Sequence, residues 1–515
     1  MYYAASAKEA TMLKKLLPAA CALAFAVAEA RANENDWFRP LGAPPKASPR
    51  RISGGEGVPP LPLPATPLRR SERKRDPSPP KLVGKVIWGE SASFKYDTGH
   101  KTDIADWNLC PGDLQALMQR ATNAIGTPYG SDSVNLAQFD GDPSKMPVLL
   151  FSGVRTIRFD PKQIALLRAY VLNGGTIIAD SIAGSPYFYA SFRKAMEAAF
   201  PEFAVRPIPP DHPVYHMVVD VDRVRFPKNR TGDTPELEGI YVGCRAAVLL
   251  SKYGLGCGWD NHEVPGIEKA VYYDVGSANK IGVNLVAYAL GYANVGREEA
   301  KPELFGALDE KLPTDEFLFA QIKHEGAWNA HPGGAAALLR RLRQNTSLRV
   351  SLKRLSVTPG KDDLSSFGFL YMSGLDDFTW DANAASALRA FLNRSGTLFI
   401  NNALGLRTFD AAARRELKKL LPGADLQPIP PSHPIYSSVF KVADAQYTPA
   451  AMREHPELKT PYLEGITING DIRVIYSPFD MEAGWQGCDH PLARAFAPTS
   501  AMQLGINIAM YAATH

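Results

Sequence analysis

The sequence predicts an α/β protein made of two tandem three-layer α/β/α domains with mainly parallel sheets. The first observation is an internal repeat: RPIPPDHPVY (206–215) recurs as QPIPPSHPIY (427–436), with seven of ten positions identical. The second is a series of short apolar runs, which are typical of strands buried on both faces. The third is that helical patterns alternate with these runs, which favours a parallel sheet covered by helices on both sides.

The repeat extends over most of the 515 residues, a length that suits more than one core. Further matches follow in the same order and end with GVNLVAYA (282–289) and GINIAMYA (505–512). We therefore expect two homologous domains at 83–297 and 315–515, joined by a linker at 298–314.

Strands and helices follow the same order in both copies. PVLLFSG (147–153) and FGFLYMSG (367–374) are predicted strands. Asp160 is a predicted N-cap with Pro161 at the first helical position, and Asp381 takes the capping position in the second copy. In open parallel sheets, ligands bind beyond the carboxyl ends of the strands. We therefore expect any site to lie at that edge.

The N-terminal part of the chain predicts export. Residues 12–32 combine a short cationic start, an apolar run and small residues, the pattern of a secretory signal peptide. Residues 33–82 are rich in proline and basic residues and predict a disordered linker. Within it, RRSERKR (69–75) is either a solvated segment or a contact to an anionic surface. We expect a periplasmic or secreted protein.

Composition excludes several classes of protein. No apolar run reaches the roughly 18 residues that a membrane span needs. The formal net charge of the whole chain is +4, and the first 82 residues alone hold +7. Residues 83–515 therefore carry about −3. Because a nucleic-acid-binding domain concentrates Lys and Arg on its folded surface, we expect no nucleic-acid partner.

The cysteines allow two interpretations in an oxidising compartment. Beyond the signal peptide the chain has Cys110, Cys244, Cys257 and Cys488. Cys244 and Cys257 flank an apolar strand and could pair across a hairpin, whereas a buried thiol is an equally good interpretation for each cysteine. No Cys/His spacing predicts zinc, so we expect neither metal nor cofactor.

Several linked motifs resemble the bacterial domain-of-unknown-function family 4159. They include the apolar strand ending in Gly, DHP at 211–213, LEG at 237–239 and 463–465, and the G-x-N-x-x-x-Y-A helices. Both copies match over almost their full length. The resemblance implies a flavodoxin-like fold related to class I glutamine amidotransferases, often in cell-envelope proteins, and it implies no established reaction.

One group of residues is a candidate for catalysis. Asp180 and Ser181 follow a predicted central strand, and Asp211 and His212 lie in the PDHPVY turn. Carboxylates with a histidine can polarise water as general acid or base. The alternative is structural: His212 packs in a proline-rich turn and Asp211 bonds to a backbone N–H. No Cys occupies the turn after this strand, and Ser181 lacks the flanking glycines of a nucleophile elbow.

A second group consists of candidate ligand-binding positions at the strand ends and in the second copy's polar set. The aromatic members could stack on a sugar or another flat ligand, or could anchor the core. These positions are Gly153, Trp259, Gly374, His433, Asp480 and Trp485.

Neither copy has the complete polar set. The second copy has Asn401 where the first has Asp180, and Ser432 where the first has Asp211. We therefore expect a non-catalytic scaffold that binds an envelope protein or a carbohydrate. The alternative is an envelope hydrolase, acting on a carbohydrate or an amide, that uses Asp180, Asp211 and His212.

Overall fold

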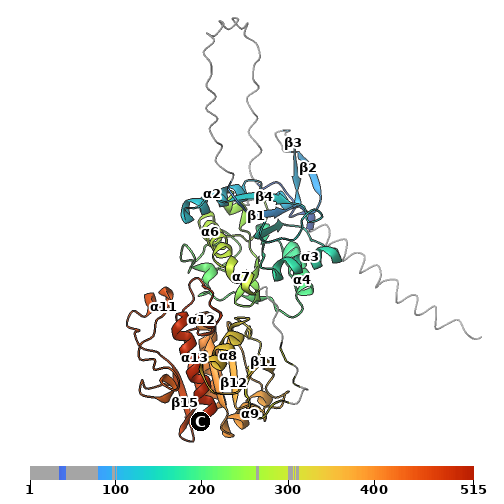
Figure 1. The fold of residues 1–515 in the computed structure, drawn as a ribbon. Coiled ribbons are helices and arrows are strands. Elements are labelled where there is room, and N and C mark those ends of the chain that lie inside the picture. The colour runs from blue at the N-terminus through green and yellow to red at the C-terminus, as the bar shows by residue number, and fades with distance from the viewer. Residues whose placement is uncertain are drawn as a thin grey trace, which may run out of the picture.

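The computed structural model shows two α/β domains in succession, with the first above the second in Figure 1. The predicted signal peptide at 12–32 and the basic stretch at 69–75 lie outside the described residues. The described residues are 34–41, 79–95, 99, 101–262, 266–299, 305–306, 308 and 312–515.

The first domain has a seven-stranded sheet in the order β4-β1-β5-β6-β9-β8-β7. The first five of these strands are parallel, whereas β8 and β7 add antiparallel pairs at one edge. The strands are β1 (Lys81–Val86), β4 (Gly130–Val134), β5 (Val148–Gly153), β6 (Thr176–Ser181), β7 (Arg206–Pro207), β8 (Leu237–Val242) and β9 (Arg245–Ser251).

The second domain repeats this sheet in the order β11-β10-β12-β13-β16-β15-β14. The two identical topologies confirm the predicted duplication of one mainly parallel α/β unit. The strands are β10 (Phe317–Ile322), β11 (Val350–Val357), β12 (Phe369–Gly374), β13 (Thr397–Asn402), β14 (Gln427–Pro428), β15 (Glu464–Ile468) and β16 (Asp471–Ser477).

Helices cover both faces of each sheet, so each domain has three layers. In the first domain they are α2 (Asp113–Ile125), α3 (Pro161–Leu172), α4 (Pro186–Ala199), α5 (Gly256–Trp259), α6 (Val275–Gly291) and α7 (Ala293–Glu299). In the second they are α8 (Gly334–Asn345), α9 (Ala382–Asn393), α10 (Arg407–Leu420), α11 (Pro449–Glu454), α12 (Glu482–Gln486) and α13 (Pro498–Thr514). Short 3-10 turns are η1 (Asp106–Asn108), η2 (Ile182–Gly184), η3 (Pro213–Tyr215), η4 (Ala403–Gly405) and η5 (Pro434–Tyr436).

The layers separate the apolar core of each domain into two clusters. In the second domain, one face of the sheet packs against α8 and α13 and the other against α9 and α10. The predicted caps fix two of the helix starts. Asp160 accepts a hydrogen bond from the backbone of Gln163 at 2.8 Å, and Asp381 accepts one from Ala384 at 2.7 Å.

The domains are stacked head to tail. The turn between β8 and β9, at the amino end of the first sheet's central strands, faces the carboxyl edge of the second sheet. Buried residues that follow the second domain's strands, among them Leu375 and Leu404, belong to the same apolar cluster as α6 of the first domain. Asp211 accepts a hydrogen bond from the backbone N–H of Arg407 at 2.7 Å across this interface.

Residues 34–41 pack against the first domain. Trp37 and Phe38 are buried, and the Arg155 guanidinium lies 3.7 Å from the centre of the Phe38 ring. The prediction of a linker disordered from residue 33 onward is therefore wrong for this segment, because its two aromatic side chains provide the apolar surface that ordering requires.

A disulfide joins Cys110 to Cys257 beside these aromatic residues, with the Cα atoms 5.5 Å apart. The considered pairing of Cys244 with Cys257 is therefore wrong, because Cys244 lies at the other end of β9, in the domain interface. In the described part of the chain, no helix combines the length and the apolar character that a bilayer crossing requires.

Candidate functional site

The carboxyl edge of the first sheet contains a buried pair of carboxylates. Asp180, at the end of β6, accepts hydrogen bonds from the backbone N–H groups of Leu255 (2.8 Å) and Gly256 (2.7 Å). Burial outweighs these bonds and raises its pKa to about 7. Nearby, Asp113 pairs with Lys85 at 2.7 Å, and burial raises the pKa of Asp113 as well.

The second domain has its own buried pair at the same edge. Asp480 accepts hydrogen bonds from the side chains of His331 (2.6 Å) and Asn401 (3.0 Å) and from three backbone N–H groups at 2.8–3.2 Å. Burial would raise the pKa of Asp480, but His331 and these bonds lower it to about 2. Glu482 accepts a bond from the Tyr371 hydroxyl at 2.9 Å, and burial raises its pKa to about 7.

The first carboxylate of each pair comes from a different backbone position in the two copies. Asp113 corresponds in the repeat to Gly334, and Gly256 corresponds to Glu482. A Cβ atom at Gly334 would lie 2.6 Å from the Glu482 side chain, and one at Gly256 would lie 2.8 Å from Asp180. In each copy the glycine makes room for a carboxylate of the same domain, and the two copies supply that carboxylate from positions that do not correspond in the repeat.

The second carboxylate is relocated in the same way. Asp180 corresponds to Asn401, and Gly254 corresponds to Asp480. At Gly254 a Cβ atom would lie 2.6 Å from the backbone nitrogen of Ala183. Both copies therefore keep two fully buried carboxylates at one edge although the aligned positions differ. Their burial and their hydrogen bonds to neighbouring backbone and side-chain groups indicate a structural role in holding the strand ends together.

The structure does not bring the predicted catalytic residues together. His212 is buried against Tyr241 and Tyr288, and the Tyr288 hydroxyl accepts a hydrogen bond from the backbone N–H of Ala246, near the start of β9. Asp180 is paired with Ser251 at the other end of β9. Ala246 and Ser251 are five residues apart along β9, which corresponds to roughly 16 Å. Asp180 and His212 therefore cannot act on one substrate atom.

The remaining predicted polar residues do not face a common site. Asp211 faces the second domain, and the Ser181 hydroxyl is buried without a hydrogen-bond partner among the described residues. His212 accepts a bond from the backbone of Val214 at 3.2 Å, and His433 makes the equivalent bond at 3.3 Å. Each histidine thus caps a 3-10 turn, which explains the repeated HP pair.

Gly153 and Gly374 make room for internal rings at the strand ends. A Cβ atom at Gly153 would lie 2.1 Å from the Trp88 ring, and one at Gly374 would lie 2.7 Å from the His324 ring. Each ring donates a hydrogen bond to the carbonyl of the serine before the glycine, at 2.9 and 2.8 Å. The rings therefore fill the crevice between the first and third parallel strands, where flavodoxin-like folds bind ligands.

Trp259 and Trp485 are core anchors in both copies. Their indole nitrogens donate to Ala278 (2.8 Å) and Ala501 (2.9 Å), and both side chains are almost fully buried. Neither ring face is available for stacking on a sugar. Trp485 nevertheless contributes to the floor of a groove, so this predicted ligand-binding residue does lie at a concave surface.

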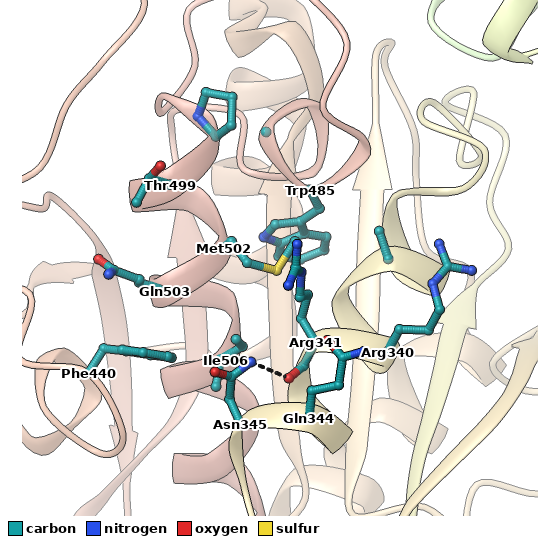
Figure 2. A pocket seen from close by; sticks show the side chains of 13 residues that line it. Arg340, Arg341, Gln344, Asn345, Phe440, Trp485, Thr499, Met502, Gln503 and Ile506 are labelled. Atoms are coloured by element: carbon teal, nitrogen blue, oxygen red, sulfur yellow. Dashed lines mark hydrogen bonds between the residues drawn. The ribbon is translucent and has the colours of Figure 1, made fainter.

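This groove lies between α8 and α13 of the second domain and has a volume of about 700 Å³ (Figure 2). Its floor is apolar and its rim is polar. Figure 2 shows Arg341 extending between the helices toward Trp485 and Met502, whereas Arg340 points away from that floor. The lining residues are Ala337, Arg340, Arg341, Gln344, Asn345, Phe440, Gly484, Trp485, Pro498, Thr499, Met502, Gln503 and Ile506.

The equivalent groove of the first domain is bridged by an arginine. Arg120, which corresponds to Arg341, donates to the carbonyl of Trp259 (2.6 Å) and to the side chain of Asn261 (2.9 Å). The second copy has Gly487 in place of Asn261, so that acceptor is lost. Among the described residues, no side chain or carbonyl accepts a hydrogen bond from the Arg341 guanidinium.

These features define a tandem α/β protein with one mainly parallel sheet and one buried carboxylate pair in each domain. The family model described as "Domain of unknown function (DUF4159)" matches residues 94–290 and 318–513. The chain belongs to this family as a tandem pair, because the two matches together cover well over half of it. A comparison with curated proteins found no match.

Proposed function

We propose that the protein is an exported, non-catalytic binding protein of the cell envelope, and that its second domain binds an anionic ligand in the groove between α8 and α13. The observation that carries this proposal is the contrast between two equivalent arginines. Arg120 is held by two hydrogen bonds within the first domain, whereas Arg341 lies on an open groove.

The ligand class follows from the groove's charge. No Asp or Glu is present among the lining residues described above, and α8 carries Arg340, Arg341 and Arg343 without an acidic residue. Arginine binds carboxylate and phosphate groups through paired N–H donors. The amide side chains of Gln344 and Gln503 add donors and acceptors for hydroxyl groups. An acidic carbohydrate has both the anionic groups that arginine binds and the hydroxyl groups that amide side chains bind.

Replacing Arg341 by alanine should weaken binding of an acidic sugar at least about tenfold, because a hydrogen bond to a charged group is worth about 1.5–3 kcal/mol. The measurement is calorimetric titration of the purified protein with short oligogalacturonate chains. Arg343→Ala is the matched control, since Arg343 is on the same helix but outside the groove. It should change the affinity less than about twofold.

Neutral maltooligosaccharides of the same length provide the comparison ligand. Equal binding of neutral and acidic chains, or an Arg341→Ala variant that binds as well as the wild type, would refute an anionic-ligand groove. No binding of oligogalacturonate by the wild type would refute the acidic-sugar class.

Export is supported by the disulfide between Cys110 and Cys257, since such bonds persist in oxidising compartments. We expect the protein recovered from an envelope fraction to begin shortly after residue 30 or 32, following removal of the signal peptide. Peptide mapping without reduction should yield the Cys110–Cys257 pair. The same chain lacking residues 1–32 is the control and should yield these peptides reduced. An uncleaved N-terminus in the envelope fraction would contradict this prediction.

A further inference from the structure

Three side chains that can bind a metal ion meet in the interface between the domains. Cys244, His331 and His490 each offer one ligand atom, and these atoms lie within 4.8 Å of one another. All three residues are at least nine-tenths buried. The cluster is separate from the groove between α8 and α13, and it does not depend on the proposed function.

The ligands come from three places in the chain and from both domains. Cys244 occupies the turn between β8 and β9 of the first domain, His331 precedes α8, and His490 lies between α12 and α13. In the second copy the corresponding turn, Asn469-Gly470, is exposed. The cysteine is thus found in the copy whose turn docks against another domain.

The surroundings of the two histidines favour metal binding over simple packing. The Nε2 atom of His331 is bound by Asp480 at 2.6 Å, which orients the ring so that Nδ1 faces the cluster. The Nδ1 atom of His490 lies 3.2 Å from Cys244 Sγ.

We propose that Cys244, His331 and His490 bind one zinc ion that links the two domains. Thiolate and imidazole are the ligands that zinc prefers, and three protein ligands leave the fourth tetrahedral position for water or another group. A pocket of about 400 Å³, lined by His490, Cys488 and Thr448, lies next to the cluster and provides a path for entry. On binding, the Cys244 thiol loses its proton to solvent as the zinc–sulfur bond forms.

This proposal revises the sequence-based expectation that the protein has no metal. Zinc sites are usually recognised from short Cys/His spacings. Here Cys244 is 87 residues before His331, and His331 is 159 residues before His490, so only the stacking of the domains brings them together.

The test uses the mature protein, stripped with a chelator and titrated with Zn²⁺ and, separately, with Co²⁺. We expect one equivalent of tightly bound zinc by elemental analysis after dialysis. The cobalt form should show the intense thiolate-to-cobalt absorption band of a cysteine ligand. Cys244→Ser should abolish that band, and His490→Ala should lower zinc affinity at least about tenfold.

Two matched variants serve as controls. Cys488→Ser removes the neighbouring cysteine and His455→Ala removes a histidine that is 48% exposed, and both should retain one equivalent of zinc. A wild-type protein that binds no zinc, or whose cobalt form lacks the thiolate band, would overturn the proposal without any reliance on a variant. Retention of the band in a folded Cys244→Ser protein would do the same.

Discussion

Replacing Asp480 by alanine should lower the free energy of unfolding by about 3–5 kcal/mol, because it removes the one carboxylate that several buried hydrogen-bond donors share. Asp480 is fully buried and accepts five hydrogen bonds, including one from His331 at 2.6 Å. The substitution leaves these donors without an acceptor in a site that water does not reach.

Chemical denaturation of chelator-treated protein measures this effect independently of any metal. Asp315→Ala is the control, because Asp315 forms an ion pair with Arg349 in which both side chains are more than half exposed. That variant should lose less than about 1 kcal/mol. If the Asp480→Ala variant also loses less than about 1 kcal/mol, the buried hydrogen-bond network contributes little to stability.

The Asp180→Asn substitution should make the first domain's stability less dependent on pH. Burial raises the pKa of Asp180 from its ordinary value of 3.8 to about 7 in the folded state. The folded protein therefore holds a proton that the unfolded chain releases between these values. The stabilisation from this group is complete below pH 3.8 and is lost as the pH rises through 7.

The expected size of the effect follows from the pKa difference of about 3 units, or about 4 kcal/mol. The free energy of unfolding of the wild type, relative to that of the Asp180→Asn variant, should fall by about this amount between about pH 4 and about pH 8. The second copy already has Asn401 at this position, where it accepts a bond from Met481 at 2.8 Å, so asparagine fits the site.

Asp132→Asn provides a control of opposite sign. A hydrogen bond from Lys81 lowers the pKa of Asp132, so its stabilisation is present above pH 3.8 and is lost at lower pH. Because Asp132 is largely exposed, its effect should be small. A difference between wild type and Asp180→Asn that does not change over this pH range would show that Asp180 stays ionised in the folded protein.

The fold could be predicted because its signals are local or repeated. Strands buried on both faces require continuous apolar runs, and Asp160 and Asp381 mark helix starts through hydrogen bonds to residues three positions away. The repeat then shows that the second set of elements must have the topology of the first. Trp37 and Phe38 were missed because two aromatic residues in a proline-rich stretch do not reveal what they pack against.

The candidate sites depended on contacts between distant segments and could be predicted only in part. Asp180 was identified as a strand-end carboxylate and Asp480 as part of the second copy's polar set, but aligned positions suggested that each copy had lost part of this set. In the structure, the copy that has Gly254 places its carboxylate at Asp180, and the copy that has Gly334 places its carboxylate at Glu482. Each domain therefore has a complete pair of buried carboxylates. Paired glycine–carboxylate exchanges were the signal that could have revealed this.

The head-to-tail stacking has a consequence for assembly. A contact between unlike surfaces of homologous units does not close on itself, so a row of such units can in principle grow from its outer end. In this protein that end is the carboxyl edge of the first domain, and Trp37 and Phe38 cover part of it. The segment therefore covers apolar surface on which a further unit would have to dock, as the terminal repeats of solenoid proteins cover the ends of their stacks.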